Sequence, residues 1–115
     1  SWSLARILGE PRAKALALTA SPLDADTAAQ WGLIWQAVPD ASLWDTAFAL
    51  AQTLAKGPTK AYGLTKHAIH AAADQSLDRQ LDLERDLQRE AGRSADYAEG
   101  VSAFLQKRPA EFKGQ

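Results

Sequence analysis

Two side chains near the end of the chain have types and a spacing that could bind a ligand. Phe104 and Lys107 are three residues apart in a segment with helical periodicity, so an aromatic ring and an ammonium group would project from one face. An aromatic face suits an adenine ring and an ammonium suits a phosphate, the two parts of an adenosine phosphate. A lysine at the C-terminal end of a helix also compensates the helix dipole, which is the commoner reason for its presence. The residues alone leave both interpretations open.

A second polar group has a spacing that a metal ion could use. His67, His70 and Asp74 would share one face of a helix. The opposite face carries Tyr62 and Ile69, which makes the histidine face the solvated side of an amphipathic helix. No second acidic or histidine ligand is indicated nearby. We therefore predict no metal site.

The sequence lacks what several other kinds of site require. It has no cysteine, which excludes disulfides and thiolate chemistry, and no Gly-x-Ser-x-Gly motif or glycine-rich phosphate loop. The net charge is −1, and segment 33–44 contains no Lys or Arg, so we expect no nucleic-acid binding. No apolar run approaches the roughly 20 residues of a membrane span. We expect a cytoplasmic protein that does not bind membranes.

The composition predicts a mainly α fold with a thin core. Alanine accounts for 24 of the 115 residues, and only five are Val or Ile. Alanine favours helices but buries little surface, so we expect the chain to need a partner surface. Four tryptophans could stack on an aromatic ligand, but core or interface packing is the favoured interpretation.

Turn and cap signals divide the chain into short helices with no domain boundary. The expected helices are 1–8, ending at Gly9; 11–20; Asp24 to Gly32; Asp40 or Ser42 to Lys56; Pro58 to Asp74; Ser76 to Ala91; and a final one capped by Ser94 that runs to a cationic end at Lys107 and Arg108. Residues 33–38, between Gly32 and Pro39, are the only stretch with strand character. At most one short strand is therefore expected.

The helix after Ser76 carries an arc of leucines. Leu77, Leu81, Leu83 and Leu87 fall within about 160° at 100° per residue, which is wide enough for a buried face. Glu84 lies inside the same arc. We expect it to be partly exposed at the rim of the buried face or to meet a cation, because a buried unpaired carboxylate is costly.

The order of several short motifs resembles the enoyl-CoA hydratase/isomerase (crotonase) family. The motifs cover essentially the whole chain, at 11–19, 28–34, 38–40, 57–58, 64–66 and 99–108, with Phe112. Within the family, segments 31–36, 81–86 and 92–97 most resemble the isomerase subfamily of bacterial phenylacetate degradation, which acts on 1,2-epoxyphenylacetyl-CoA.

The resemblance implies that residues 1–115 are a single helical C-terminal region of a larger enzyme with a crotonase-type α/β fold. The substrate would be an acyl-CoA thioester, with no permanently bound cofactor. The oxyanion hole and the catalytic acid would belong to the absent N-terminal core. We therefore assign no catalytic residue here and expect the chain alone to be inactive.

This part of the family fold closes the CoA site and forms the interface of a trimer or a dimer of trimers. By position, Phe104 and Lys107 would contact the adenosine-phosphate end of CoA. The alternative is an independent helical protein-interaction module with no small-molecule role.

Overall fold

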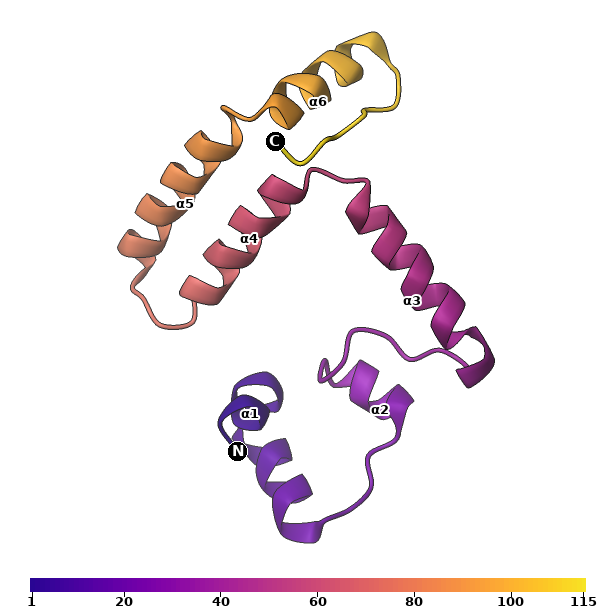
Figure 1. The fold of residues 1–115 in the computed structure, drawn as a ribbon. Helices are drawn as coiled ribbons and strands as arrows, with labels where there is room; N and C mark the ends of the chain where they lie inside the picture. Colours follow the sequence, from indigo (N-terminus) through magenta and orange to yellow (C-terminus); the bar gives the residue numbers. More distant parts are fainter. The chain divides into compact units, whose positions relative to one another are not determined.

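The computed structural model describes residues 1–115, which form helices joined by turns and loops (Figure 1). The six helices are α1 (Trp2–Thr19), α2 (Ala25–Gln30), α3 (Asp40–Ala55), α4 (Thr59–Ala71), α5 (Leu77–Ala91) and α6 (Ala95–Gln106). No strand forms, so the mainly α prediction is confirmed. The chain divides into two compact units, 1–46 and 47–115, and α3 contributes residues to both.

In the first unit, α1 is broken at the glycine where the sequence predicts a helix end. Gly9 has φ 75° and ψ 161°, which is not helical, and the helix resumes with Pro11 in its first turn. Proline is tolerated there because its missing N–H would have no intrahelical partner. The buried apolar residues of this unit are Leu8, Ala13 and Ala28.

The short helix α2 begins as the sequence predicts. Asp24 Oδ1 accepts a hydrogen bond from the Thr27 backbone N–H at 2.8 Å, and its Oδ2 accepts one from the Thr27 hydroxyl at 2.8 Å. Both bonds stabilise the ionised carboxyl, so they lower the pKa of Asp24.

Residues 33–38, the stretch with strand character, form no strand, which is within the expectation of at most one short strand. Gly32 has φ 77°, and this left-handed backbone turns the chain so that the Leu33 N–H donates to the Ala28 carbonyl at 2.9 Å. The start of the apolar segment therefore closes the C-terminal end of α2. No neighbouring strand exists to pair with the remainder.

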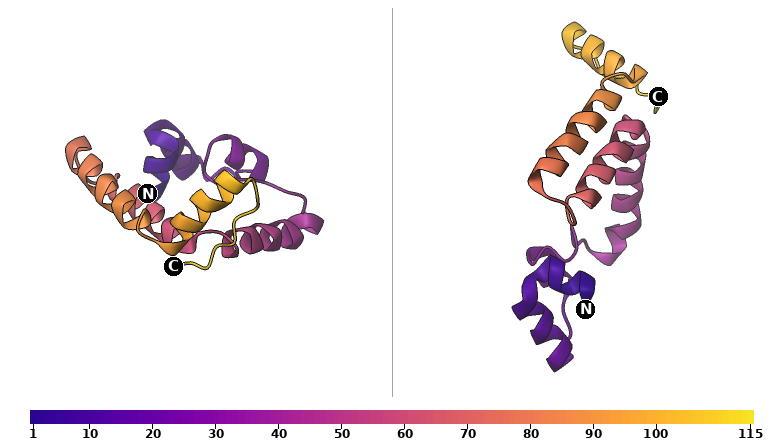
Figure 2. Two further views of the ribbon diagram at one scale, coloured as in Figure 1. Left: turned by 90° about the horizontal axis from the view of Figure 1, so that it is seen from above. Right: turned by 90° about the vertical axis from the view of Figure 1, so that its left-hand side faces the viewer.

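In the second unit, α4 and α5 form an antiparallel pair that lies side by side (Figures 1 and 2). A buried side chain, Gln80, joins them. Its amide donates to the Ala68 carbonyl of α4 at 3.1 Å and to Glu84 Oε1 at 2.6 Å, and its oxygen accepts from Gln75. Helix α4 ends at Ala71, three residues before the expected end at Asp74.

Only half of the leucine arc of α5 is covered. Leu83 and Leu87 are half-buried, whereas Leu77 and Leu81 are 71% and 55% exposed. Within the chain, the expected buried face is therefore only half formed, because α4 packs over the side of the arc that contains Gln80. Glu84 is exposed and bonds to Gln80 rather than to a cation, which agrees with the rim position.

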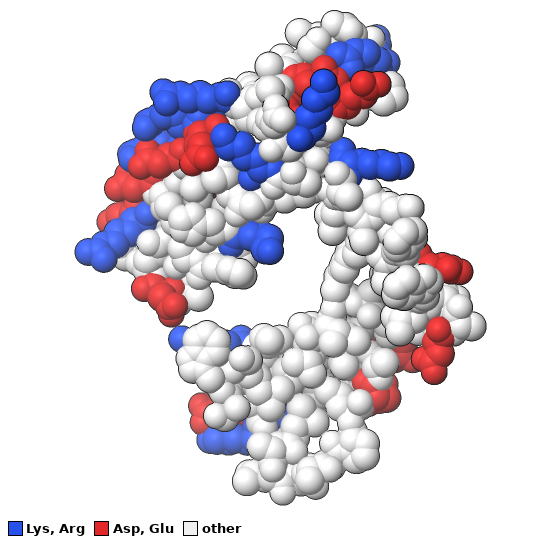
Figure 3. Space-filling view, viewed as in Figure 1, with Lys and Arg blue, Asp and Glu red and all other residues white.

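The outward side of α5 is charged. Arg85 pairs with Asp82 at 2.8 Å and with Asp86 at 3.1 Å, and Arg89 pairs with Asp86 at 3.2 Å. Figure 3 shows red and blue side chains gathered over α5. Exposed pairs of this kind add little stability each but keep the surface solvated.

The chain buries few large side chains, as its alanine content predicts. Trp2, Trp35 and Trp44 are 64%, 78% and 76% exposed, so they do not fill a core within the chain. The guanidinium of Arg6 lies 3.8 Å from the ring centroid of Trp2, and that of Arg12 lies 4.7 Å from the ring centroid of Trp31. None of the helices has the length and apolar character needed to cross a bilayer.

Candidate functional site

Helix α6 carries both predicted ligand-binding residues, and its start is set by a local cap. Ser94 Oγ accepts a hydrogen bond from the Tyr97 N–H at 3.0 Å, which satisfies one of the free donors at the helix N-terminus. Asp96 lies in the first turn, where a negative charge favours the helix dipole. The predicted cap at Ser94 is confirmed.

Helix α6 ends at Gln106, one residue before Lys107, the lysine predicted to bind a phosphate. Lys107 is the C-terminal cap in the left-handed conformation, with φ 54° and ψ 40°. The Lys107 N–H donates to the Phe104 carbonyl at 3.2 Å, and the Arg108 N–H donates to the Ala103 carbonyl at 3.0 Å. Two of the free carbonyls at the end of α6 are thereby paired within the turn.

A bidentate ion pair closes the chain back onto α6 after this turn. Arg108 Nη1 donates to Glu99 Oε1 at 2.6 Å, and Arg108 Nη2 donates to Glu99 Oε2 at 2.9 Å. The Glu111 backbone N–H adds a third bond to Glu99 Oε1, at 2.9 Å. The Arg108 bonds first, and then the Glu111 bond, lower the pKa of Glu99 to about 2.

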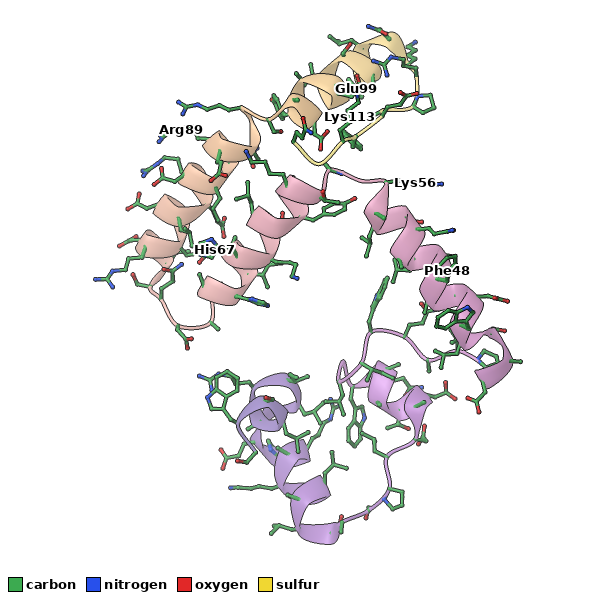
Figure 4. The ribbon with its side chains drawn as sticks, viewed as in Figure 1. Phe48, Lys56, His67, Arg89, Glu99 and Lys113 are labelled. Carbon is green, nitrogen blue, oxygen red and sulfur yellow. The ribbon has the colours of Figure 1, made fainter.

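A second carboxylate of α6 binds the end of the chain. Asp96 is 3% exposed; its Oδ1 accepts from the Lys113 N–H at 2.7 Å and its Oδ2 from the Gly114 N–H at 2.8 Å. The Asp96 N–H donates to the Gln115 carbonyl at 3.0 Å. Residues 109–115, the C-terminal tail, therefore run back along α6, and Figure 4 shows Glu99 and Lys113 on adjoining segments.

An apolar groove of about 380 Å³ lies beside α6 in the second unit. Its lining includes Tyr97, Val101, Phe104 and Leu105 of α6, Pro58 and Ala61 near the start of α4, and Phe112 of the tail. Phe104 is 83% exposed and Leu105 is 74% exposed. A surface this apolar is suited to contact with another apolar surface or an aromatic ring.

The two predicted ligand-binding residues remain accessible at one end of α6. Lys107 is exposed, and no acidic side chain forms an ion pair with its ammonium. Because Lys107 occupies the cap and not the helix, the turn rather than helical periodicity sets the direction in which it leaves α6. The structure brings the pair to the same end of the helix but shows no contact between the two side chains.

The histidine face of α4 does not assemble a cluster. His67 and His70 lie on α4, whereas Asp74 follows the end of the helix. No group of three His, Cys, Asp or Glu side chains in the chain comes together as metal ligands would.

Comparison with known proteins gives the family. The model of the enoyl-CoA hydratase/isomerases matches residues 1–115. The chain belongs to this family. The family resemblance of the sequence motifs is thereby confirmed.

Individual relatives of this enoyl-CoA hydratase/isomerase chain match it over nearly its whole length. The 1,2-epoxyphenylacetyl-CoA isomerase of Escherichia coli K12 is 56% identical over 115 residues, which are 100% of this chain and 44% of that protein. A crystal structure from Mycobacterium abscessus assigned to the enoyl-CoA hydratase/isomerases has a TM-score of 0.94 and 37% identity, covering 98% of this chain and 44% of that one. An enoyl-CoA hydratase structure from Geobacillus kaustophilus has a TM-score of 0.92 and 33% identity, covering 97% and 42%.

The chain spans less than half the length of these relatives, and the matched part is their C-terminal part. This confirms the prediction of a helical C-terminal portion of a crotonase-type fold. The statement that residues 1–115 form a single region of a larger enzyme stays a prediction.

The contacts that shape the end of α6 are not predicted from the sequence. Neither the pair between Glu99 and Arg108 nor the bonds from the tail to Asp96 correspond to a helical spacing. Arg108 follows Glu99 by nine residues, which is not a helical neighbour spacing, so periodicity gives no signal. Pro109, which ends any helix, was the available sign that the chain turns there.

Proposed function

We propose that this chain is the C-terminal region of an acyl-CoA isomerase or hydratase, of the type that isomerises 1,2-epoxyphenylacetyl-CoA. The 56% identity over all 115 residues to the Escherichia coli isomerase is the observation that carries this choice. The substrate is an acyl-CoA thioester, and no further cofactor is permanently bound. The oxyanion hole and proton-transferring acid belong to the N-terminal part of the enzyme, so this region supplies no catalytic residue and is inactive alone.

In this proposal, the end of α6 closes the CoA site. The exposed ring of Phe104 packs against adenine, and the unpaired ammonium of Lys107 binds a phosphate of the adenosine end. Both groups lie far from the reacting thioester along the CoA chain. Their contribution is therefore binding and orientation of substrate, not proton transfer.

The proposal also gives the uncovered apolar side chains a role. Val101, Leu105 and Tyr97 of α6 are exposed here and would be covered by a neighbouring subunit in a trimer or a dimer of trimers. Native mass measurement of the complete enzyme tests this part. A stable monomer at micromolar concentration would contradict it.

A second candidate function is an independent helical protein-interaction module. The exposure of Leu77 and Leu81 on the α4–α5 pair favours it, because an uncovered leucine face suits a partner helix. The reading frame upstream of Ser1 discriminates between the two. Oxyanion-hole glycines and an acidic residue just before Ser1 support the enzyme, whereas an initiator methionine directly before Ser1 supports the module.

The direct test of the enzyme proposal is Lys107→Ala in the complete enzyme. The phosphate contact is made equally in the ground state and the transition state, so KM for the acyl-CoA should rise about tenfold with kcat nearly unchanged. Lys56→Ala is the matched control, because Lys56 is an exposed lysine directly after the end of α3. A large fall in kcat at unchanged KM would overturn the assignment.

A further inference from the structure

Lys107 occupies a backbone position that normally belongs to glycine. Its φ of 54° lies in the left-handed region, where a Cβ is disfavoured, and helices that end in this way most often place glycine there. Only one other non-glycine residue of the chain, Ala20, has a positive φ. A lysine at this position keeps an ammonium at the turn in spite of the backbone cost, which points to a role for the side chain.

The residues that follow Lys107 fasten the turn through their side chains and backbone, whereas the side chain of Lys107 makes no bond to it. The Arg108 N–H bonds to the Ala103 carbonyl, and the Arg108 guanidinium binds both oxygens of Glu99 at 2.6 and 2.9 Å. The Glu111 N–H adds a bond to the same carboxylate. The backbone on both sides of Lys107 is thus attached to α6, while its ammonium is left without an acidic partner.

We propose that Glu99 and Arg108 are positioning residues that set the direction of Lys107 for a phosphate of the bound CoA. This rests on the proposed function and adds to it the part of the chain that orders the ligand-binding lysine. Without the ion pair, the turn would relax away from the left-handed conformation and the ammonium would sample many positions. Binding a phosphate would then require ordering the turn, which weakens affinity without touching the reacting thioester.

The geometry separates this role from direct binding by Arg108. Four of the five guanidinium N–H groups are already engaged: Nη1 donates to Glu99 Oε1 and to the Pro109 carbonyl, Nη2 donates to Glu99 Oε2, and Nε donates to Gln106 at 2.9 Å. If Arg108 itself bound the phosphate, removing the Glu99 charge would free the guanidinium and tighten binding. If Arg108 positions Lys107, the same change weakens binding.

The test compares two substrates of the complete enzyme, an acyl-CoA and the same acyl group on pantetheine, which lacks the adenosine phosphate. The variants are Glu99→Gln, Lys107→Ala and the double variant. We expect Glu99→Gln to raise KM for the acyl-CoA about three- to fivefold and Lys107→Ala about tenfold. The double variant should be no worse than Lys107→Ala, because an absent ammonium cannot be misplaced. KM for the pantetheine thioester and kcat should not change.

A charge-conserving variant and a control variant complete the test. Arg108→Lys keeps the positive charge but cannot form the bidentate pair with Glu99. It should therefore raise KM for the acyl-CoA, as Glu99→Gln does. Glu90→Gln, an exposed glutamate of α5, is the control and should leave both KM values unchanged. The positioning role is overturned if Glu99→Gln leaves KM for the acyl-CoA unchanged or lowers it, or if its effect multiplies that of Lys107→Ala. If Lys107→Ala itself has no effect, the proposed phosphate contact fails instead.

Discussion

The carboxylate of Glu99 binds the guanidinium of Arg108 through both oxygens, with N–O distances of 2.6 and 2.9 Å, although nine residues separate them in sequence. This pair returns the chain onto α6 directly after Lys107. It leaves the ammonium of Lys107 exposed and without an acidic partner, and it starts the tail toward Asp96. The Glu99–Arg108 pair, the helix cap at Lys107 and the proposed contact with CoA therefore all involve the end of α6.

Glu99 should make the stability of the protein depend on acid pH. Its pKa falls from 4.5 to about 2 on folding, so the stabilisation is fully present above the unfolded value and is lost as pH falls through the folded value. The difference in free energy of unfolding between wild type and Glu99→Gln should be constant above pH 5 and shrink between about pH 4.5 and pH 2. Urea denaturation at a series of pH values measures it. A difference that does not change with pH in this range would contradict the assignment.

The left-handed cap predicts that two substitutions at one position differ in their effect on stability. Lys107→Gly removes the Cβ and relieves the strained backbone, for a gain of up to about 1 kcal/mol that is partly offset by the greater freedom of glycine in the unfolded chain. Lys107→Ala keeps the Cβ and should leave stability within about 0.5 kcal/mol of wild type. Both variants lose the ammonium. Urea denaturation that ranks the glycine variant below the alanine variant would refute the role of strain.

Gly114 should tolerate no side chain where the tail passes α4. Its φ is 76°, and an added Cβ would lie 2.5 Å from the Thr59 hydroxyl oxygen. Gly114→Ala should cost about 1–3 kcal/mol and loosen the tail. Gly63→Ala, in the open on α4, is the control and should stabilise by about 0.5–1 kcal/mol. Equal effects of the two substitutions on unfolding by urea would argue against the tail packing described.

Asp96 should fasten the last residues of the chain. Asp96→Asn leaves one acceptor oxygen and places an NH₂ group opposite a backbone N–H. It should therefore lower the free energy of unfolding by about 1–3 kcal/mol. Trypsin should then cleave after Lys113 faster than in wild type. Asp82→Asn, on the exposed side of α5, should leave the cleavage rate unchanged. Identical protection of Lys113 in wild type and Asp96→Asn would show that this carboxylate does not bind the tail.

The local features of the fold could be predicted because their causes lie within a few residues. Gly9 breaks α1, and Asp24 and Ser94 accept hydrogen bonds from the residues three positions later. Such caps need no knowledge of the rest of the chain. The apolar segment 33–38 has a composition that suits a strand, but the turn at Gly32 and the lack of a pairing strand within the chain decide its structure.

The features of the fold that could not be predicted depend on packing between helices and on the path of the tail. The leucine arc of α5 was visible in the sequence, but α4 alone decides which half is covered. The types of Phe104 and Lys107 suggested a ligand, but helical spacing missed the cap that directs Lys107. The nine-residue spacing of Glu99 and Arg108 does not predict their contact.

The most direct test of the central claim is the preference of the complete enzyme for an acyl-CoA over the matching acyl-pantetheine. In the proposed function, Lys107 binds a phosphate that only the CoA thioester carries. The ratio of the two kcat/KM values should therefore fall about tenfold in Lys107→Ala, through KM for the acyl-CoA alone. An unchanged ratio would contradict the claim that this end of α6 binds CoA.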